Sequence, residues 1–341
     1  MNVGVIGAGI VGLATAYALR LRGADVTVYE RGVPGNGQSG GESRIFRHLH
    51  DDPRLIALAI EASAGWREWE DDFGRELVAR DGVVALGPAA PRRFALLREA
   101  GLRTRRIEPA HHPLLAPRGS DAILDEDGGV IRATAVIGAL AAALREELVQ
   151  DEVVAVRRTG EVRAGGVTAH HDRVVIAAGR GTPALARGAG LALPVRQSAH
   201  VRLAFRTGET GLPCLLDGDA GAYGDPLPGG FAVGLGETPA HDDGGVLDPG
   251  GLAAEAARVA EYVRVTLPAL GDAFEARHCW VTDLPWSHDG IAVWERDALL
   301  VVAGNNLFKH APALGRALAA AALGESLRAD LRPEARLGYV T

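Results

Sequence analysis

Two short apolar runs flank a helical pattern at the start of the chain. The first run is Val3 to Ile6, the helical pattern extends to Leu21, and the second run is Asp25 to Tyr29. Successive β-branched residues are typical of a buried strand, and apolar residues spaced three and four apart favour a helix. The pattern therefore predicts a strand, a glycine-rich turn, a helix and a second strand that ends at Glu30.

Comparable patterns return in the middle and at the end of the chain. They predict a helix over Ile131 to Leu148, a strand over Val153 to Val156, and a buried strand from Val174 that stops at Gly179. Near the C-terminus they predict a buried strand over Leu299 to Ala303, a loop over Gly304 to Lys309, and a helix from Ala311 onward. Buried strands that alternate with helices indicate an α/β domain with a parallel sheet.

The segments between these elements have a different pattern of apolar and turn-forming residues. Val83 to Leu86, Val201 to Phe205 and Phe231 to Leu235 are short apolar runs between turns rich in glycine and proline. Short strands of this kind are typical of an antiparallel sheet. We expect a second, discontinuous domain there, with an α+β fold built on a mostly antiparallel sheet.

The bulk composition argues against several classes of function. With 341 residues, 47% of them hydrophobic, the chain is long enough for two domains. The net charge is −7 and the arginines are scattered, whereas nucleic-acid binding needs clustered cations. No apolar stretch reaches the roughly 20 residues of a membrane helix, so we expect a cytoplasmic protein without a membrane partner. A monomer is the default expectation. The histidine pairs 111–112 and 170–171 lack the spacing of metal ligands, so no metal site is predicted.

The turn after the first strand carries Gly7, Gly9 and Gly12. Glycines at this spacing allow a tight turn, close approach of backbone N–H groups to a pyrophosphate, and close packing of the helix on the strand. Glu30, at the end of the second strand, is placed to accept hydrogen bonds from ribose hydroxyls. The alternative is an incidental glycine-rich turn, but the strand, helix and terminal acid that a dinucleotide site requires are all present.

A polar, glycine-rich loop follows Glu30 and interrupts the dinucleotide fold, which nicotinamide dehydrogenases usually continue. This loop contains SGGESRIFRH (39–48), and four other segments accompany it: GAGIVG (7–12), VVIAAG (174–179), CWVTDLP (279–285) and GNNLFK (304–309). Together they resemble the D-amino-acid-oxidase superfamily of FAD-dependent oxidoreductases, and within it the monomeric sarcosine oxidase and N-methyltryptophan oxidase group. The resemblance extends over nearly the whole chain.

The resemblance implies a Rossmann-like FAD-binding domain of the glutathione-reductase type (residues 1–80, 128–192 and 288–341) and a substrate domain (residues 81–127 and 193–287). It implies oxidation of a C–N bond in a small amine, amino acid or cyclic imino acid, with a small-molecule substrate as the partner. The residues expected to contact FAD are Gly7, Gly9, Gly12, Glu30, Arg31, Ser39, Ser43, Arg44, Val153, Ala178, Gly179, Cys279, Gly304, Asn306, Leu307, Phe308 and Lys309.

Three cationic residues are expected to be catalytic. By the resemblance, Arg44 lies against the flavin ring, Arg47 lies near the substrate carboxylate, and Lys309 holds that carboxylate. A guanidinium is a permanent cation suited to an anionic flavin or a carboxylate. Lys309 is also the only lysine in a chain that otherwise uses arginine, which favours a site-specific role. The alternatives are that the arginines only anchor a surface loop and that the lysine is an ordinary surface charge.

The two cysteines, Cys214 and Cys279, are too few for a disulfide scaffold. Cys279 matches the family cysteine whose sulfur bonds covalently to the flavin, and the neighbouring Arg277 or His278 is placed to favour its thiolate. The alternative for Cys279 is ordinary burial. Cys214 has no such context and is expected to be a packing residue.

Several departures from sarcosine oxidases bear on the substrate. Those enzymes carry a second lysine on a strand of the substrate domain, where its charge promotes oxygen reduction, but residues 230–237 contain none. Positions that flank sarcosine are replaced around Ala222–Tyr223 and Glu237–Thr238, and Asn305–Asn306 stands in place of a Gly-His-Gly turn. We therefore expect a substrate other than sarcosine and a slow reaction with oxygen. The alternatives are a desaturase or dehydrogenase of a natural-product pathway that uses another electron acceptor, and a flavin- or NAD-binding protein without redox turnover.

Overall fold

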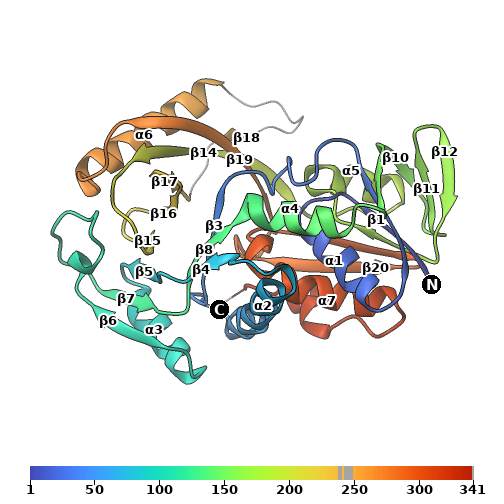
Figure 1. The fold of residues 1–341 in the computed structure, drawn as a ribbon, viewed down its shortest axis with the longest axis horizontal. Helices are drawn as coiled ribbons and strands as arrows, with labels where there is room; N and C mark the ends of the chain where they lie inside the picture. The colour runs from blue at the N-terminus through green and yellow to red at the C-terminus, as the bar shows by residue number, and fades with distance from the viewer. Residues whose placement is uncertain (237–239, 242–248, 340–341) are drawn as a thin grey trace.

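The strand–turn–helix–strand unit at the N-terminus lies inside a six-stranded sheet. The computed structural model describes residues 1–236, 240–241 and 249–339, and Figure 1 shows this sheet in the lobe that contains the N-terminus. The strand order is β20-β21-β13-β1-β2-β9, and all neighbours are parallel except β20 and β21. The strands are β1 (Asn2–Ile6), β2 (Asp25–Glu30), β9 (Leu148–Gln150), β13 (Arg173–Ile176), β20 (Ile291–Arg296) and β21 (Leu299–Gly304). The four strands predicted for this sheet are thereby confirmed.

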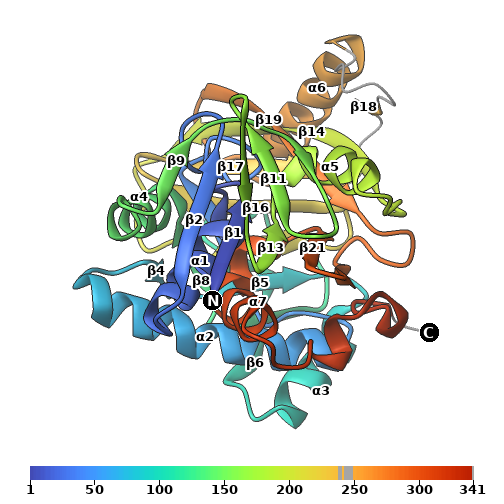
Figure 2. The same cartoon turned by 90° about the vertical axis from the view of Figure 1, so that its right-hand side faces the viewer.

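Helices cover one face of this sheet and a smaller sheet covers the other. Four helices share a hydrophobic core with the first face: α1 (Ile10–Leu21), α2 (Pro53–Phe73), α4 (Ala133–Ala143) and α7 (Ala311–Ala322). Figure 2 shows α1 and α7 side by side, and they approach closely at Gly315, where a Cβ atom would lie 2.6 Å from the carbonyl carbon of Ala14. The second face packs on α5 (Thr182–Gly188) and on three antiparallel strands, β10 (Val153–Val156), β11 (Glu161–Ala164) and β12 (Val167–His170).

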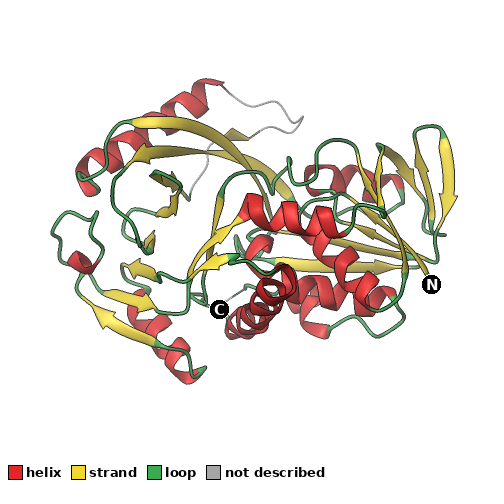
Figure 3. Cartoon of the chain, in the orientation of Figure 1, coloured by secondary structure: helices red, strands yellow, loops and turns green. Residues whose placement is uncertain are grey.

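The second lobe is built on a nine-stranded sheet. Figure 3 draws its strands in yellow. Its strands are β18 (Ala240–His241), β14 (Arg196–Arg206), β17 (Gly230–Leu235), β16 (Ala222–Leu227), β15 (Cys214–Asp217), β5 (Val83–Leu86), β7 (Ala122–Asp125), β6 (Thr104–Ile107) and β19 (Ala273–Asp283), which pairs with β14. Only β5 and β15 pair in parallel, so the predicted mostly antiparallel sheet is confirmed. Helices α6 (Pro249–Thr266) and α3 (Ala90–Glu99) pack against it.

A small fourth sheet lies between the lobes and carries the polar loop. It consists of β3 (Ser43–Phe46), β8 (Gly129–Arg132) and β4 (Val78–Ala79). Because β3 is paired along its length with β8, the segment that contains Arg44 is a regular strand. Within the residues that the structure describes, five short 3-10 turns complete the fold: η1 (Pro109–His111), η2 (Gly179–Gly181), η3 (Leu307–His310), η4 (Ala329–Leu331) and η5 (Pro333–Ala335).

Two local predictions were wrong in extent. The helix expected over Ile131 to Leu148 begins at Ala133 and ends at Ala143, because Ile131 and Arg132 pair with β3 and the end of the segment forms β9. Tertiary pairing thus overrides an apolar helical pattern. The loop expected over Gly304 to Lys309 instead contains η3, which leads directly into α7. None of the helices in the described part of the chain is both long and apolar enough to cross a membrane.

Candidate active site

A cavity of about 1920 Å³ lies between the six-stranded and nine-stranded sheets. Every residue predicted to contact FAD or to be catalytic lines this cavity, except Gly12. Sites for one drug-sized ligand are usually about 300–1,000 Å³. The cavity is therefore large enough for a dinucleotide together with a small second molecule.

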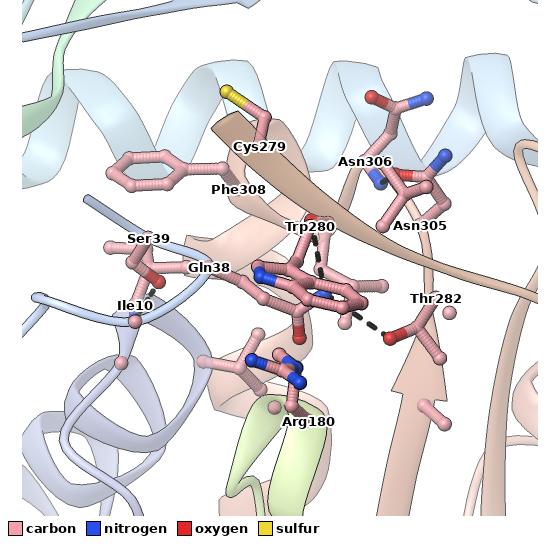
Figure 4. Close-up of a pocket in the computed structure, with 18 of the residues that line it drawn as sticks. Ile10, Gln38, Ser39, Arg180, Cys279, Trp280, Thr282, Asn305, Asn306 and Phe308 are labelled. Atoms are coloured by element: carbon pink, nitrogen blue, oxygen red, sulfur yellow. Dashed lines mark hydrogen bonds between the residues drawn. The ribbon is translucent and has the colours of Figure 1, made fainter. Parts of the chain in front are cut away.

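The glycine turn shapes the end of the cavity at α1. Gly7 has a φ of 98°, which side chains rarely adopt, and a Cβ atom on Gly12 would overlap the carbonyl oxygen of Gly7. A Cβ atom on Gly9 would instead meet the hydroxyl of Ser39 at 3.2 Å. That hydroxyl accepts a hydrogen bond from the Ile10 N–H at 3.0 Å, as Figure 4 shows. The helix N-terminus thus meets the cavity with no side chain at Gly9, which suits the pyrophosphate of FAD.

Glu30 ends β2 with its carboxylate held in a fixed position at the cavity wall. One oxygen accepts a hydrogen bond from the Ala8 N–H at 2.9 Å, and the other accepts from the Gly32 N–H at 3.0 Å. The neighbouring Arg31 pairs with Glu152 at 3.3 Å, and both of these side chains are largely exposed. A carboxylate fixed at the end of the second strand is the group that a ribose requires.

The polar loop folds back on itself around Arg44. The guanidinium donates hydrogen bonds to the carbonyl oxygens of Ser43 (2.7 Å), Gln38 (3.1 Å) and Gly40. Its carbon lies 5.6 Å from the ring centre of Phe308. Burial, and then the charge of Arg202, lowers the pKa of Arg44 from its usual value. Arg44 is therefore a half-buried group of the cavity wall whose guanidinium is held by backbone carbonyl oxygens.

The same loop is tied to β19, which brings Cys279 to the cavity. The Gln38 side-chain amide donates to the Trp280 carbonyl at 3.1 Å and to the Thr282 hydroxyl at 3.2 Å, as Figure 4 shows. Below Trp280 the guanidinium carbon of Arg180 lies 3.5 Å from the ring centre. Cys279 is half-buried.

The second cysteine lies in a different environment. Cys214 is fully buried in β15, within an apolar cluster that includes Leu49 and Ile56. Burial raises the pKa of its thiol well above the usual value. These properties fit the packing role expected from the sequence.

A cluster of charged and imidazole groups occupies the far end of the cavity. Arg47 donates to both carboxylate oxygens of Asp289, at 2.8 and 3.1 Å, and also to the Leu49 carbonyl. The ammonium of Lys309 lies 3.9 Å from Asp289, which is an ion-pair distance but too long for a hydrogen bond. The backbone of Lys309 is held in η3 because its carbonyl accepts the indole N–H of Trp66 at 2.9 Å.

Burial sets the ionisation of this cluster. Burial, followed by the charge of Arg47, lowers the pKa of Lys309 from 10.5 to about 7. The same two effects lower the pKa of His50 to about 3, and burial holds the pKa of His310 well below its usual value. Burial opposes ionisation of Asp289, but Arg47 and Lys309 hold its pKa well below the usual range. Near neutral pH both histidines are therefore uncharged, Asp289 is an anion, and Lys309 is poised between its two forms.

The cavity wall formed by the nine-stranded sheet carries polar residues, of which the sequence singled out only Tyr223, as a replaced position that flanks sarcosine in the resembling family. Tyr223 on β16 and His200 on β14 are separated by β17, and the tyrosine hydroxyl lies 2.6 Å from Nε2 of His200. They meet over Gly234, where a Cβ atom would lie 2.5 Å from that hydroxyl. Burial, and then Arg202, lowers the pKa of His200 to about 4, so this pair is neutral.

Beside this pair, Arg202 and Asp225 form a buried ion pair with an N–O distance of 2.9 Å. Arg202 also donates to the hydroxyl of Ser43 at 2.7 Å and to its carbonyl at 3.2 Å, which ties the nine-stranded sheet to β3. The only sequence signal for this link is an arginine inside the apolar run 201–205. Asp289, in a loop after β19, gave no local signal at all.

The strand expected to lack a lysine is β17. Its Ala232 and Val233 are fully or almost fully buried, and Lys309 is the only lysine of the chain. The replaced positions Glu237 and Thr238 lie outside the described residues.

Comparisons with known proteins agree with this geometry. The family model described as FAD dependent oxidoreductase matches residues 2–321. N-methyl-L-tryptophan oxidase of Salmonella arizonae is 24% identical over 372 residues, which cover 96% of each chain. Human peroxisomal sarcosine oxidase is 30% identical over 213 residues, but this match covers only 56% of the present chain and 54% of the human protein.

Solved structures share the fold over the whole length. NikD, described as an unusual amino acid oxidase essential for nikkomycin biosynthesis, superimposes with a TM-score of 0.83 at 22% identity, covering 98% of this chain and 96% of NikD. L-proline dehydrogenase from P. horikoshii gives a TM-score of 0.82 at 20% identity and covers 100% and 99% of the two chains. Since the family model spans nearly the entire chain, the protein belongs to the family of FAD-dependent oxidoreductases and its cofactor is FAD.

Proposed function

We propose that this enzyme oxidises a C–N bond in a small amino acid or cyclic imino acid, or in a closely related amine. The observation that supports this most directly is the ammonium of Lys309. It is only 3% exposed, faces the cavity, and has no hydrogen-bond acceptor within the described part of the chain. An ammonium carries three donors, and burying such a group without an acceptor is costly. A ligand carboxylate would supply the acceptor.

The substrates named for related proteins are consistent with a carboxylate. One relative acts on sarcosine, another on N-methyl-L-tryptophan, and a structural neighbour on L-proline. All three are amino or imino acids. Sarcosine itself is not proposed here, because Tyr223 and Asn305–Asn306 replace the family's sarcosine-flanking residues.

FAD, when bound, supplies the two-electron oxidising group, and the protein supplies position and charge. We assign Gly7, Gly9 and Gly12 to the pyrophosphate, Glu30 to the ribose, and Arg44 to the flavin. Arg44 suits this role because its guanidinium is already oriented by three carbonyl oxygens. The nearby cations also disfavour an ammonium beside them. They therefore favour the uncharged amine, which is the form that can be oxidised at carbon.

A second candidate differs only in the electron acceptor. Because β17 lacks a lysine, a dehydrogenase or desaturase that passes electrons to something other than oxygen is the alternative function. The same substrate site would serve both reactions.

The first test concerns the pyrophosphate. Gly9→Val should abolish FAD retention, because its side chain would displace Ser39 and enter the cavity at the end of α1. Gly138→Val is the matched control, since it adds the same side chain to a helix surface with nothing within 4 Å. The flavin absorbance of the purified variants measures the outcome. Normal FAD content in Gly9→Val would show that this turn does not bind the cofactor.

The second test concerns covalent attachment of the flavin to Cys279. Acid precipitation of the wild type should leave the flavin in the pellet, whereas Cys279→Ala should release it into the supernatant. Cys214→Ala, which alters a buried packing thiol, should behave as wild type. Release of flavin from the wild type would mean that Cys279 forms no bond to it.

The third test concerns Lys309. A lost charge-assisted hydrogen bond typically costs about 1.5–3 kcal/mol, so Lys309→Met should weaken propionate binding by roughly one to two orders of magnitude. Titration of the flavin absorption band measures this affinity. Since burial lowers the pKa of Lys309 to about 7, the ammonium is present below that pH, and wild-type affinity should fall as pH rises through 7. Lys309→Arg should bind propionate without that pH dependence, because arginine stays charged. Equal binding by wild type and Lys309→Met would contradict the assignment.

The fourth test concerns oxygen. Without a cation on β17, the reduced enzyme should reoxidise slowly in air, because little charge is available there to stabilise superoxide. Stopped-flow absorbance of the reduced flavin mixed with oxygen gives the rate. A fast rate that persists in Lys309→Met would identify Arg44 or a histidine as the cation that serves oxygen.

A further inference from the structure

Asp289 is a carboxylate at the far end of the cavity that lies within ion-pair distance of both Arg47 and Lys309. It accepts from Arg47 at 2.8 Å, from Nδ1 of His50 at 3.2 Å, and from the side-chain amide of Asn306. Its own backbone is fixed as well, since its N–H donates to the Ser287 hydroxyl at 3.1 Å. The Asp289 side chain is nevertheless 26% exposed, so it shares the cavity with any ligand.

These contacts give Arg47 and Lys309 different roles. Arg47 directs its terminal nitrogens to Asp289, to the Leu49 carbonyl and toward His50. Lys309 has only a loose ion pair with Asp289 at 3.9 Å. The charge of Arg47 is thus matched by a protein carboxylate, while the ammonium of Lys309 remains available to a ligand.

The charges of the cluster formed by Arg47, Lys309, Asp289, His50 and His310 can be counted; the nearby carboxylate of Asp51 is paired with Arg93 at 2.7 Å. Arg47 and protonated Lys309 contribute two positive charges, and Asp289 removes one. His50 and His310, whose rings lie 5.3 Å apart in the same cluster, add none because both are neutral. When Lys309 is protonated, the cluster therefore carries one net positive charge, which one carboxylate would neutralise.

We propose that Asp289 determines substrate specificity by balancing the charge of Arg47, so that this end of the pocket accepts a substrate with a single carboxylate held by Lys309. The pocket rejects a second anionic group because Asp289 already occupies the position between the cations. This inference rests on the proposed function. It goes further because it makes Arg47 a positioning residue and names the substrate class as monocarboxylates.

The test measures dissociation constants of propionate and malonate from shifts of the flavin absorption band in the holoenzyme. Wild type should bind propionate more tightly than malonate. Because Asp289 raises the pKa of Lys309, both proteins are compared at a pH low enough to keep Lys309 protonated. Under that condition Asp289→Asn leaves two net positive charges, so its affinity for propionate should rise at least about tenfold, and malonate should become the tighter ligand. Asp289→Glu keeps the charge and should retain the wild-type order. Asp330→Asn is the matched control: Asp330 also pairs with an arginine, is 25% exposed, and lies outside the cavity.

A charge-restoring pair separates charge balance from direct contact. Arg47→Gln alone leaves the cluster neutral, so propionate binding should weaken at least about tenfold. The double variant Arg47→Gln/Asp289→Asn restores one net charge and should return propionate affinity to within about threefold of wild type. Removing both members of a buried pair also disturbs folding less than removing one, so the double variant keeps the test usable if Asp289→Asn does not fold.

Two results would overturn the proposal. One is an unchanged propionate affinity in folded, FAD-containing Asp289→Asn, and the other is a double variant as weak as Arg47→Gln, which would mean that Arg47 itself holds the ligand. Failure of the proposed function looks different: propionate would not perturb the flavin of the wild type or of any variant, and no amine would reduce it.

Discussion

An ammonium almost completely removed from water sets the conditions that the rest of this site must meet. The pKa of Lys309 lies at about 7 because burial and the charge of Arg47 oppose protonation of the amine, while the carboxylate of Asp289 favours it. Removing any member of this group changes the charge of the others, since all lie in one poorly solvated end of the cavity. The binding of an anionic ligand and the protonation of Lys309 are therefore linked equilibria, and each favours the other.

The position of that ammonium depends on both lobes and on the links between them. Trp66 of α2 and the helix α7 fix η3, while Asp289 comes from the loop after β19 of the other sheet. Two further links hold the polar loop between the lobes: Gln38 bonds to β19, and Arg202 bonds to Ser43. A buried ion pair such as Arg202–Asp225 adds little net stability compared with apolar packing. Its contribution here is to fix the distance between β14 and β3, the strand that carries Arg44.

Local sequence patterns predicted the parts of this structure that depend on neighbouring residues. The strand, glycine turn, helix and terminal Glu30 form one continuous segment, and the spacing of Gly7, Gly9 and Gly12 specifies its geometry. The mostly antiparallel sheet of the second lobe was likewise predicted from short apolar runs such as Phe231 to Leu235. The family resemblance located Arg44, Arg47 and Lys309, and all three line the cavity.

The rest depends on contacts between distant segments, which leave little local trace. Nothing near Asp289 indicates that Arg47, more than two hundred residues earlier, would be its partner. The pairing of Tyr223 with His200 requires a glycine on the strand between them, so three strands must be placed before it can be seen. The helix expected from Ile131 was shortened for the same reason, since β3 is its distant pairing partner.

The central claim is that the cavity brings a C–N bond to the flavin by way of Lys309. Its most direct test is anaerobic mixing of the holoenzyme with matched sets of small amino acids, cyclic imino acids and the corresponding 2-hydroxy acids, followed by absorbance and by analysis of the product. The account predicts that amino or imino acids bleach the flavin and yield an imine or its carbonyl hydrolysis product, whereas the hydroxy acids do not. Bleaching by hydroxy acids alone, or by none of these compounds, would contradict it.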